Sequence, residues 1–326
     1  MLELGMNEDL YSLLVGSITI GGLFGSLVSG KMADMIGRRR GLGVAMSISA
    51  VGWLGVATSI SPAMIFSARI VHGIGEGIAV AISIFYLGEL IEEKYRGGAI
   101  SSINISCLFG IALAYVMSMF IPWRISATIN GIINLVSILL TLIIPESPQW
   151  KKFKDNTKKK ENAESMEKKK ESKKSAPEDE SLPTAPFSRA ISISIPLLLL
   201  LLSPVSGVYS ISFYAASIAR NLQIEQPTAV AIAVSLIRTV GCGCGVAFVQ
   251  LVGRRASLII SAGTQILFLV LVSVLLLVDS IQALILNWSL TALLFLVMFS
   301  SSLGMTPTPW ILCGEWPAVK DKVILF

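Results

Sequence analysis

The chain has 326 residues, of which 53% are hydrophobic and 14% are charged, and its mean hydropathy is +0.74. A water-soluble domain of this length could not hide so much apolar surface, so the composition excludes that class of protein. The net charge of +5 does not identify a partner by itself, because its meaning depends on where the basic residues lie.

Apolar runs follow one another along the sequence, and each is close to the roughly 20 residues that a helix needs to cross a bilayer. They do not alternate between polar and apolar positions, which favours helices over a transmembrane barrel. We therefore predict an all-α membrane protein. The roughly nine expected spans are, in chain order, 10–30, 42–60, 63–88, 98–120, 125–144, 190–219, 228–250, 256–278 and 283–311.

Lysine and arginine residues are concentrated in every second connection between these spans, which together hold 22 of the 26 basic residues. Since cytoplasmic loops are enriched in Lys and Arg, we predict that these connections are cytoplasmic and that Met1 starts outside. The positive charge then reflects membrane topology. The expected partner is the lipid bilayer, and no nucleic-acid partner is expected.

A lysine- and glutamate-rich segment at 151–189 can neither enter lipid nor build a core. We interpret it as a solvated cytoplasmic linker, with contact between its lysines and lipid headgroups as an alternative. The linker divides the chain into an N-terminal half-bundle at 1–150 with five spans and a C-terminal half-bundle at 190–326 with four.

The run from Gly241 to Gly245 reads Gly-Cys-Gly-Cys-Gly, which at first sight looks like a metal motif. Small residues that let helices approach closely are the better explanation, because the run lies inside an apolar span. His72 is the only histidine, and the sequence has no nucleophile, metal or phosphate-loop pattern. We therefore expect no metal, no cofactor and no enzymatic activity.

Two short patterns recur in the same order in the two halves. The letters GRR at residue 37 return at residue 253, and YLGE ending at Glu89 is echoed by LCGE ending at Glu315. The two separations are nearly equal. Such a parallel duplication is expected of two homologous half-bundles joined by a central linker.

These patterns resemble the sugar porter family of the major facilitator superfamily, which includes glucose, polyol and trehalose facilitators. The resemblance covers nearly the whole chain. It is carried by Gly21, Gly25, Gly30, Asp34, Gly37, Arg38 and Arg39, by Arg69, Gly73, Gly77, Tyr86, Glu89, Arg96 and Gly97, by Pro145–Trp150, by Ser206, Gly207, Phe213 and Tyr214, by Gly253, Arg254 and Arg255, and by Pro307–Trp310 with Glu315.

The resemblance implies a major facilitator fold with about nine of its twelve transmembrane helices present. The first span here takes the place of the family's second, so 1–150 corresponds to family spans two to six and 190–326 to spans seven to ten. We therefore expect the chain to be incomplete.

The implied function is alternating-access transport of a sugar or similar small polyol, either as a facilitator or with a proton as the coupling ion. The implied location is the plasma membrane, as an integral multi-pass protein. The alternative is a nontransporting sensor, or a decayed and truncated paralogue that keeps the transporter fold.

Charges at the cytoplasmic ends of the spans are candidates for gating. The resemblance implies that arginines of the short loops pair with acids at the span ends while the binding site faces outward, and separate when it faces inward. A simpler interpretation is that these charges only fix topology. Proline breaks in the last span would add an outer gate. The gating candidates are Asp34, Arg38, Arg39, Glu89, Arg96, Glu146, Arg254, Arg255, Pro307, Pro309 and Glu315.

Substrate binding is expected where a span is broken around Pro204 and Gly207. Sugar recognition needs amide, hydroxyl and aromatic groups that face one wet cavity. Several positions here differ from the family's usual residues, so a hexose preference is not implied. By motif position the substrate-binding candidates are Asn104, Ser203, Ser206, Gly207, Tyr209, Arg238 and Trp310.

Arg69 and Glu76 are charges inside an expected span, and Arg238 lies at a depth similar to that of Glu76 in another span. One hypothesis is that Glu76 and Arg238 face the central cavity and pair, directly or through the substrate, which would select a solute more polar than glucose. The competing interpretation is local. Arg69, His72 and Glu76 share one helical face, so Glu76 can find a partner in its own helix.

Overall fold

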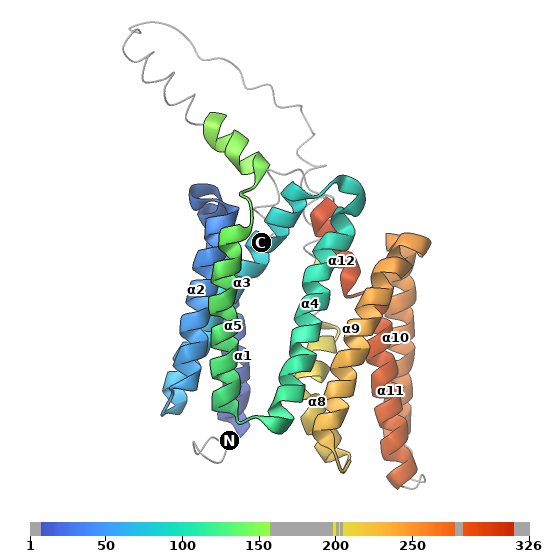
Figure 1. Ribbon diagram of the computed structural model, residues 1–326. Helices are drawn as coiled ribbons and strands as arrows, with labels where there is room; N and C mark the ends of the chain where they lie inside the picture. The colour runs from blue at the N-terminus through green and yellow to red at the C-terminus, as the bar shows by residue number, and fades with distance from the viewer. Residues whose placement is uncertain (1–7, 157–197, 200–201, 203–204, 278–282, 316–326) are drawn as a thin grey trace, which may run out of the picture. The chain divides into compact units, whose positions relative to one another are not determined.

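The computed structural model describes residues 8–156, 198–199, 202, 205–277 and 283–315 (Figure 1). The regular elements of these residues are helices, as the sequence predicts. They are α1 (Glu8–Ile36), α2 (Arg38–Ala57), α3 (Pro62–Leu90), α4 (Glu93–Phe120), α5 (Trp123–Ile143), α8 (Val208–Asn221), α9 (Pro227–Val252), α10 (Arg254–Leu276), α11 (Ala283–Leu303) and α12 (Pro307–Glu315).

Within the described residues, eight segments are long and apolar enough to cross a membrane. Of the predicted span at 190–219, residues 198–199, 202 and 205–219 are described, and they include α8 as far as Ala219. The first helix continues to Ile36, beyond its predicted end at residue 30, because helical geometry persists until Gly37. A span's apolar run therefore marks its membrane crossing, and the helix itself reaches further.

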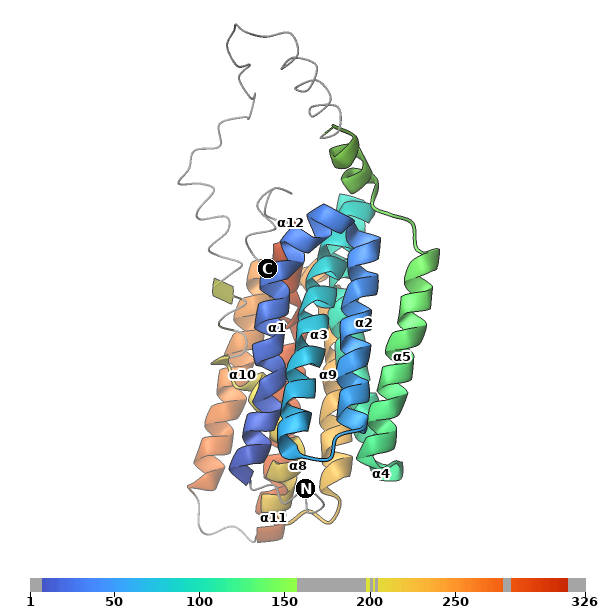
Figure 2. The same cartoon turned by 90° about the vertical axis from the view of Figure 1, so that its left-hand side faces the viewer.

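The first compact unit is formed by residues 1–90 and 127–192 and contains α1, α2, α3 and most of α5. Helix α3 lies between α1 and α2 and packs against both (Figure 2). Small and aliphatic side chains build its core, and they include Ala33, Leu42, Ala45, Ile78 and Ile82. Small residues at this interface let the three helices approach closely.

The second compact unit is formed by residues 91–126 and 193–325. Its central helix is α9, which packs against α4, α8 and α11, while α10 packs against α11 and α12 packs against α4. The core of the unit includes Ala215, Ala231, Val234, Val297 and Met298. Helix α4 thus packs with helices that follow it by more than 80 residues in the chain. The division into half-bundles at 1–150 and 190–326 stays a prediction.

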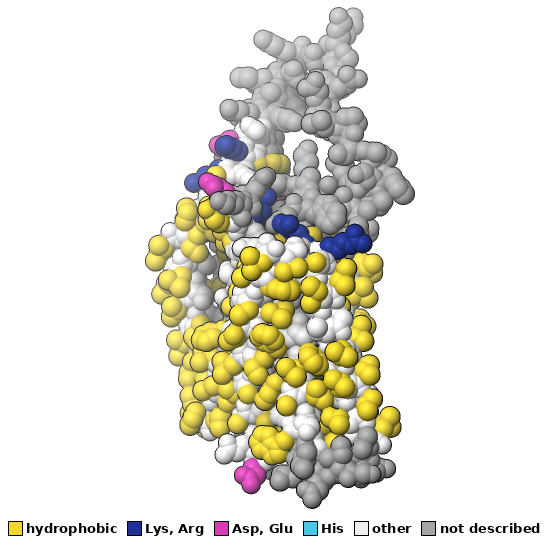
Figure 3. Space-filling model, turned by 90° about the vertical axis from the view of Figure 1, so that its right-hand side faces the viewer, with side chains coloured by type: hydrophobic (Ala, Val, Ile, Leu, Met, Phe, Trp, Pro, Cys, Tyr) yellow, Lys and Arg dark blue, Asp and Glu magenta, His cyan; other side chains and the backbone are white. Residues whose placement is uncertain are grey.

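The outer faces of the helices are apolar, which inverts the pattern of a soluble protein. On α10, for example, Ile259, Ile266, Leu267 and Val270 are exposed. Figure 3 shows hydrophobic side chains over nearly the whole length of one face, with Lys and Arg side chains gathered at one end. This surface suits an environment of lipid tails bounded by polar headgroups.

Glycines bring α1 and α3 together backbone to backbone. A Cβ added at Gly21 would collide with the carbonyl oxygen of Ile70, and one at Gly73 with the carbonyl oxygen of Ile18. Helices in lipid gain little from burying apolar surface, so close van der Waals contact of this kind is a main source of their association.

The Gly-Cys-Gly-Cys-Gly run in α9 follows the same principle. A Cβ added at Gly241 would meet Ser302 of α11, and one at Gly245 would meet the carbonyl oxygens of Ser302 and Leu303. Gly243, between them, has nothing within 4 Å of an added Cβ. The prediction that small residues here serve helix packing is confirmed at Gly241 and Gly245, which face α11 one turn apart.

The internal repeat is visible in the backbone. Gly37 has φ 98° and ψ 165° before the arginines that begin α2, and Gly253 has φ 90° and ψ 156° before those that begin α10. Only glycine takes this conformation without strain. The two GRR sequences therefore build the same local turn, in which a glycine ends one helix and lets the next begin.

The predicted break before α8 is present at Gly207. This residue is left-handed, with φ 82°, and α8 begins at the next residue. The predicted break at Ser203 and Pro204 lies outside the described residues.

The predicted break near Pro307 is also present. Helix α11 ends at Leu303 and α12 begins at Pro307, the helical position where a missing N–H costs least. Side chains hold the intervening turn, since the Met305 N–H donates to Ser261 Oγ at 3.1 Å. Thr306 donates its N–H to the Ser301 carbonyl oxygen at 3.0 Å.

Replacing Gly21 by alanine should destabilise the protein, because the added Cβ meets backbone atoms of α3 that cannot rotate away. We expect a loss of about 1 to 3 kcal/mol in the free energy of unfolding, measured as a lower thermal midpoint of the purified protein in detergent. Gly16, also in α1, has no atom within 4 Å of an added Cβ. The control Gly16→Ala should be neutral or slightly stabilising, and equal midpoints for the two variants would contradict the close packing of α1 on α3.

Candidate functional site

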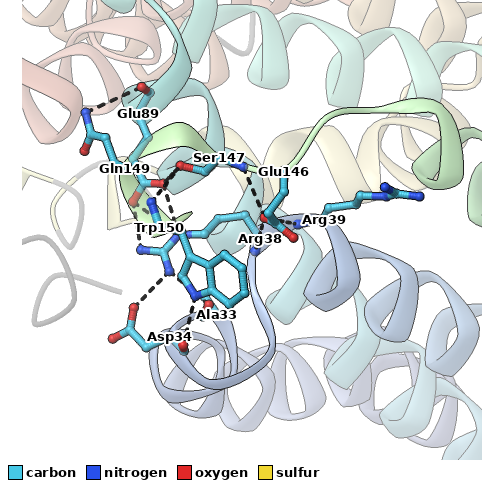
Figure 4. A network of polar contacts seen from close by, with 9 residues as sticks. All are labelled: Ala33, Asp34, Arg38, Arg39, Glu89, Glu146, Ser147, Gln149 and Trp150. Atoms are coloured by element: carbon cyan, nitrogen blue, oxygen red, sulfur yellow. Dashed lines mark hydrogen bonds and ion pairs between the residues drawn. The ribbon is translucent and has the colours of Figure 1, made fainter. Parts of the chain in front are cut away.

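A network of charges in the first unit centres on Arg38, at the start of α2 (Figure 4). Its Nη2 donates to Glu89 Oε1 at 2.7 Å and its Nε to Glu89 Oε2 at 3.0 Å, while its Nη1 donates to Asp34 Oδ1 at 3.0 Å and to the Ala33 carbonyl oxygen at 2.9 Å. All three guanidinium nitrogens are used. The forked pairing with Glu89 is among the strongest that arginine makes, and it joins α2 to α3.

Glu146 binds the N-terminus of α2. Its Oε1 accepts hydrogen bonds from the backbone N–H groups of Arg38 at 2.8 Å and Arg39 at 3.0 Å. A carboxylate is favoured here because the first N–H groups of a helix lack partners and carry partial positive charge. Gly37 makes the approach possible, since a Cβ at that residue would lie 2.6 Å from Glu146 Oε2.

Arg39 joins α2 to α5 by the complementary interaction. Its Nε donates to the Thr141 carbonyl oxygen at 2.9 Å and its Nη2 to the Leu142 carbonyl oxygen at 2.6 Å. These carbonyl groups lie at the C-terminus of α5, where a cation is favoured. The first residues of α2 thus bind the Glu146 carboxylate through their N–H groups and supply the Arg39 guanidinium to the C-terminus of α5.

The PESPQW segment at 145–150 completes the network. Ser147 Oγ donates to Glu89 Oε2 at 2.5 Å, Trp150 Nε1 donates to the Asp34 carbonyl oxygen at 2.9 Å, and Tyr86 Oη donates to the Pro145 carbonyl oxygen at 2.8 Å. No role was predicted for Ser147 or Trp150. Their place in the PESPQW segment, which carries part of the family resemblance, was the available signal.

The structure therefore brings together Asp34, Arg38, Arg39, Glu89 and Glu146 of the predicted gating residues. Arg96 lies on α4, in the second unit, and is not part of this network. The remaining gating candidates also belong to the second unit. Arg254 and Arg255 are exposed at the start of α10, Pro307 and Pro309 are buried in α12, and the Glu315 side chain lies outside the described residues.

A polar cluster in the second unit surrounds Arg238 of α9. The Arg238 residue is only 2% exposed, its Nη1 donates to Ser212 Oγ at 2.7 Å, and its Cζ lies 5.4 Å from the centroid of the Tyr209 ring. Its Nε and Nη2 are buried and have no hydrogen-bond partner within the described residues. Both contacting residues belong to α8. The predicted substrate-binding residues Tyr209 and Arg238 therefore lie together, and Ser212 joins them as a further candidate.

Gln265 of α10 contacts the break before α8. Its Nε2 donates to the Ser206 carbonyl oxygen at 3.2 Å, and its Oε1 has no partner among the described residues although the side chain is buried. Neither Gln265 nor Ser212 was predicted as a site residue. The signal for Gln265 was that it is the one amide side chain in α10.

The other substrate candidates are less closely gathered. Asn104 of α4 is 9% exposed and its Nδ2 lacks a described partner, while Trp310 of α12 is half-buried. Helices α4 and α12 pack against each other. In the described part of the chain no hydrogen bond joins either residue to Tyr209 or Arg238, and Ser203 lies outside that part.

The intramembrane charges of the first unit are arranged along α3. His72 Nε2 lies 3.6 Å from Glu76 Oε2, and His72 Nδ1 lies 2.8 Å from Ser49 Oγ. Arg69 Cζ lies 5.4 Å from the centroid of the Trp53 ring. Glu76 therefore has a close neighbour in its own helix, and the local interpretation stays a prediction. Glu76 and Arg238 belong to different compact units, and their pairing stays a prediction.

Neither site has the composition of a metal centre. Among the described residues, no group of three or more His, Cys, Asp and Glu side chains is placed to hold a metal ion. What the two sites offer is hydrogen bonding, charge and an aromatic face.

The Arg38 network gives a direct test of its energetics. Glu89→Gln should remove on the order of 3 kcal/mol from the free energy of unfolding, because it leaves a buried guanidinium without its main counter-charge. Asp34→Asn is the matched control. The Asp34 side chain is 45% exposed, so its loss should cost roughly 0 to 1 kcal/mol. Thermal midpoints in detergent measure both, and a larger loss for Asp34→Asn would show that Glu89 is not the main partner.

Comparison with known proteins gives consistent matches. The family model described as Sugar (and other) transporter matches residues 4–324. Sugar transporter ERD6-like 6 of Arabidopsis thaliana is 27% identical over 342 residues, which cover 98% of this chain and 70% of that protein.

Two solved structures share the fold. The proton:xylose symporter XylE, of the major facilitator superfamily and bound to 6-bromo-6-deoxy-D-glucose, matches with a TM-score of 0.74 and 20% identity, over 98% of this chain and 76% of XylE. The partially occluded, inward-open form of XylE from E. coli matches with a TM-score of 0.73 and 19% identity, over 97% of this chain and 77% of XylE. At this level of identity the match establishes the major facilitator fold.

Proposed function

Since this chain belongs to the Sugar (and other) transporter family, a family of integral membrane transporters and not of enzymes, we propose that it carries a sugar or a similar small polyol by alternating access. Sugar transporters of Arabidopsis thaliana are among its curated relatives, and structures of the xylose transporter XylE are among its structural neighbours. Both a facilitator and a proton-coupled mode fit the proposal. We propose the plasma membrane as its location.

The observation that carries this proposal is the polar cluster within the apolar second unit. Buried amide, hydroxyl and guanidinium groups inside a membrane protein are costly unless they serve one another or a ligand. Here they come from α8, α9 and α10 and lie next to the broken start of α8. A solute rich in hydroxyl groups could complete their hydrogen bonds, with the Tyr209 ring supplying an aromatic face.

The Arg38 network supports the second half of the proposal, which is movement. Arg38 joins α2 to α3 through Glu89, and Arg39 joins α2 to α5 through the Thr141 carbonyl, so the ends of these helices that are predicted to be cytoplasmic form one connected piece. Carriers switch by moving such pieces as rigid bodies, and changing which state dominates takes only a few kcal/mol. Charge pairs of this kind are of the right strength to bias that switch.

The alternative of a nontransporting sensor or decayed paralogue is not favoured, because the relatives and neighbours are transporters. The unpartnered polar atoms of Asn104 and Gln265 also argue for a solute. A protein without a ligand would gain stability by replacing them with apolar side chains.

Asn104→Ala should weaken sugar binding by about tenfold, since it removes one hydrogen bond worth roughly 1 kcal/mol or slightly more. The measurement is equilibrium dialysis of the purified protein in detergent against radiolabelled D-xylose and D-glucose. Asn130→Ala, on α5 of the first unit, is the control and should bind as the unaltered protein does. Absence of saturable binding of either sugar by the unaltered protein would reject the proposed solute class.

A further inference from the structure

We propose that Arg238 is a binding site for a carboxylate on the carried solute, so that the solutes include acidic sugars such as uronates. The inference rests on the proposed function and narrows its substrate class. It starts from an arginine that is buried in the membrane unit and is incompletely paired.

No acidic side chain of the surrounding helices balances the charge of Arg238. Helices α8, α9, α10 and α11 contain no Asp or Glu within their bounds, and α4 and α12 carry one each, at their outermost residues Glu93 and Glu315. Arg238 takes part in no ion pair among the described residues. A buried charge without a counter-charge is strongly unfavourable, so its persistence calls for an anion that arrives from elsewhere.

The unpartnered nitrogens define the shape of that anion. Nη1 is bonded to Ser212 Oγ, and Nε and Nη2 lack partners. Nε–H and Nη2–H lie side by side on one edge of the planar guanidinium, which matches the two oxygens of a carboxylate. The same arrangement occurs elsewhere in this chain, where Nε and Nη2 of Arg38 donate to the two carboxylate oxygens of Glu89.

A neutral sugar satisfies this edge less well. Hydroxyl groups can accept from Nε and Nη2 but leave the positive charge of the buried guanidinium unbalanced. A carboxylate supplies two acceptor oxygens in the geometry that this edge of the guanidinium fits, together with the negative charge that balances it. The sugar ring of a uronate would also offer a face to Tyr209, the aromatic side chain already stacked on Arg238.

Access to Arg238 depends on α8. Tyr209 and Ser212, its two contacts, lie in the first turns of α8, just after the left-handed Gly207. A Cβ added at Gly207 would meet nothing within 4 Å. Because both contacts belong to one helix, a movement of α8 would shift them together.

The test is equilibrium dialysis of the purified protein in detergent against radiolabelled D-glucuronate and D-glucose. We expect D-glucuronate to bind at least about tenfold more tightly than D-glucose. Arg238→Gln should abolish this preference, and Arg238→Lys should retain only part of it, because lysine keeps the charge and loses the fork. Arg220→Gln, at the exposed end of α8, is the control and should keep the full preference.

Each other outcome overturns the inference. Binding of D-glucose without a preference for D-glucuronate would leave the proposed function standing and reject the carboxylate site, whereas binding of neither sugar would reject both. If the Arg238 variants do not fold, the ratio for the unaltered protein decides alone. Binding of D-glucuronate only after Glu76→Gln would mean that Glu76 already neutralises Arg238, and the site would then not exist in the natural protein.

Discussion

The bilayer cannot solvate a charge, and two arginines that are buried in the described part of the chain show two ways of meeting that constraint. Arg38 lies at the end of a span and is paired within the protein, with each guanidinium nitrogen donating to Asp34, Glu89 or a backbone carbonyl. Arg238 lies inside a span and has one hydrogen bond and one aromatic contact within the described residues. The first arrangement holds a structure together. The second is suited to a ligand that comes and goes.

The rest of the fold follows from the same solvent. Because lipid gives helices little reason to associate through apolar burial, their contacts rely on small residues and on polar bonds at the ends. Gly21 and Gly73 let α1 and α3 touch through their backbones, and Gly241 and Gly245 do the same for α9 and α11. Polar bonds then lock the helix ends near the start of α2, where Arg39 joins α2 to α5 and Glu146 binds the first N–H groups of α2.

The sequence predicted the features that the bilayer imposes directly. Length and hydropathy predicted the spans, and the breaks at Gly207 and Pro307 followed from residues that end helices. It could not predict which helices touch, so the packing of α4 with α9 and α12 was missed. For the same reason the acidic and arginine gating candidates were predicted only as a group. The specific pair of hydrogen bonds between Arg38 and Glu89 was not predicted.

Single polar residues in apolar helices were the hardest to interpret. In the sequence, Ser212 and Gln265 look like ordinary polar residues of apolar helices. Their importance lies in contacts with other segments, because Ser212 binds Arg238 and Gln265 binds the Ser206 carbonyl oxygen. Glu76 shows the opposite case. Its neighbour His72 was visible one turn away in sequence, and the local contact is present.

The central claim is that the two units of this carrier change their relative position to move a solute, and electron-spin distance measurements test it directly. Spin labels would be attached to Arg40→Cys at the start of α2 and Arg255→Cys at the start of α10, both exposed, after replacing the four native cysteines. The account predicts at least two distances between the labels, with populations that shift when D-glucose or D-glucuronate is added. One narrow distribution that neither solute changes would contradict alternating access.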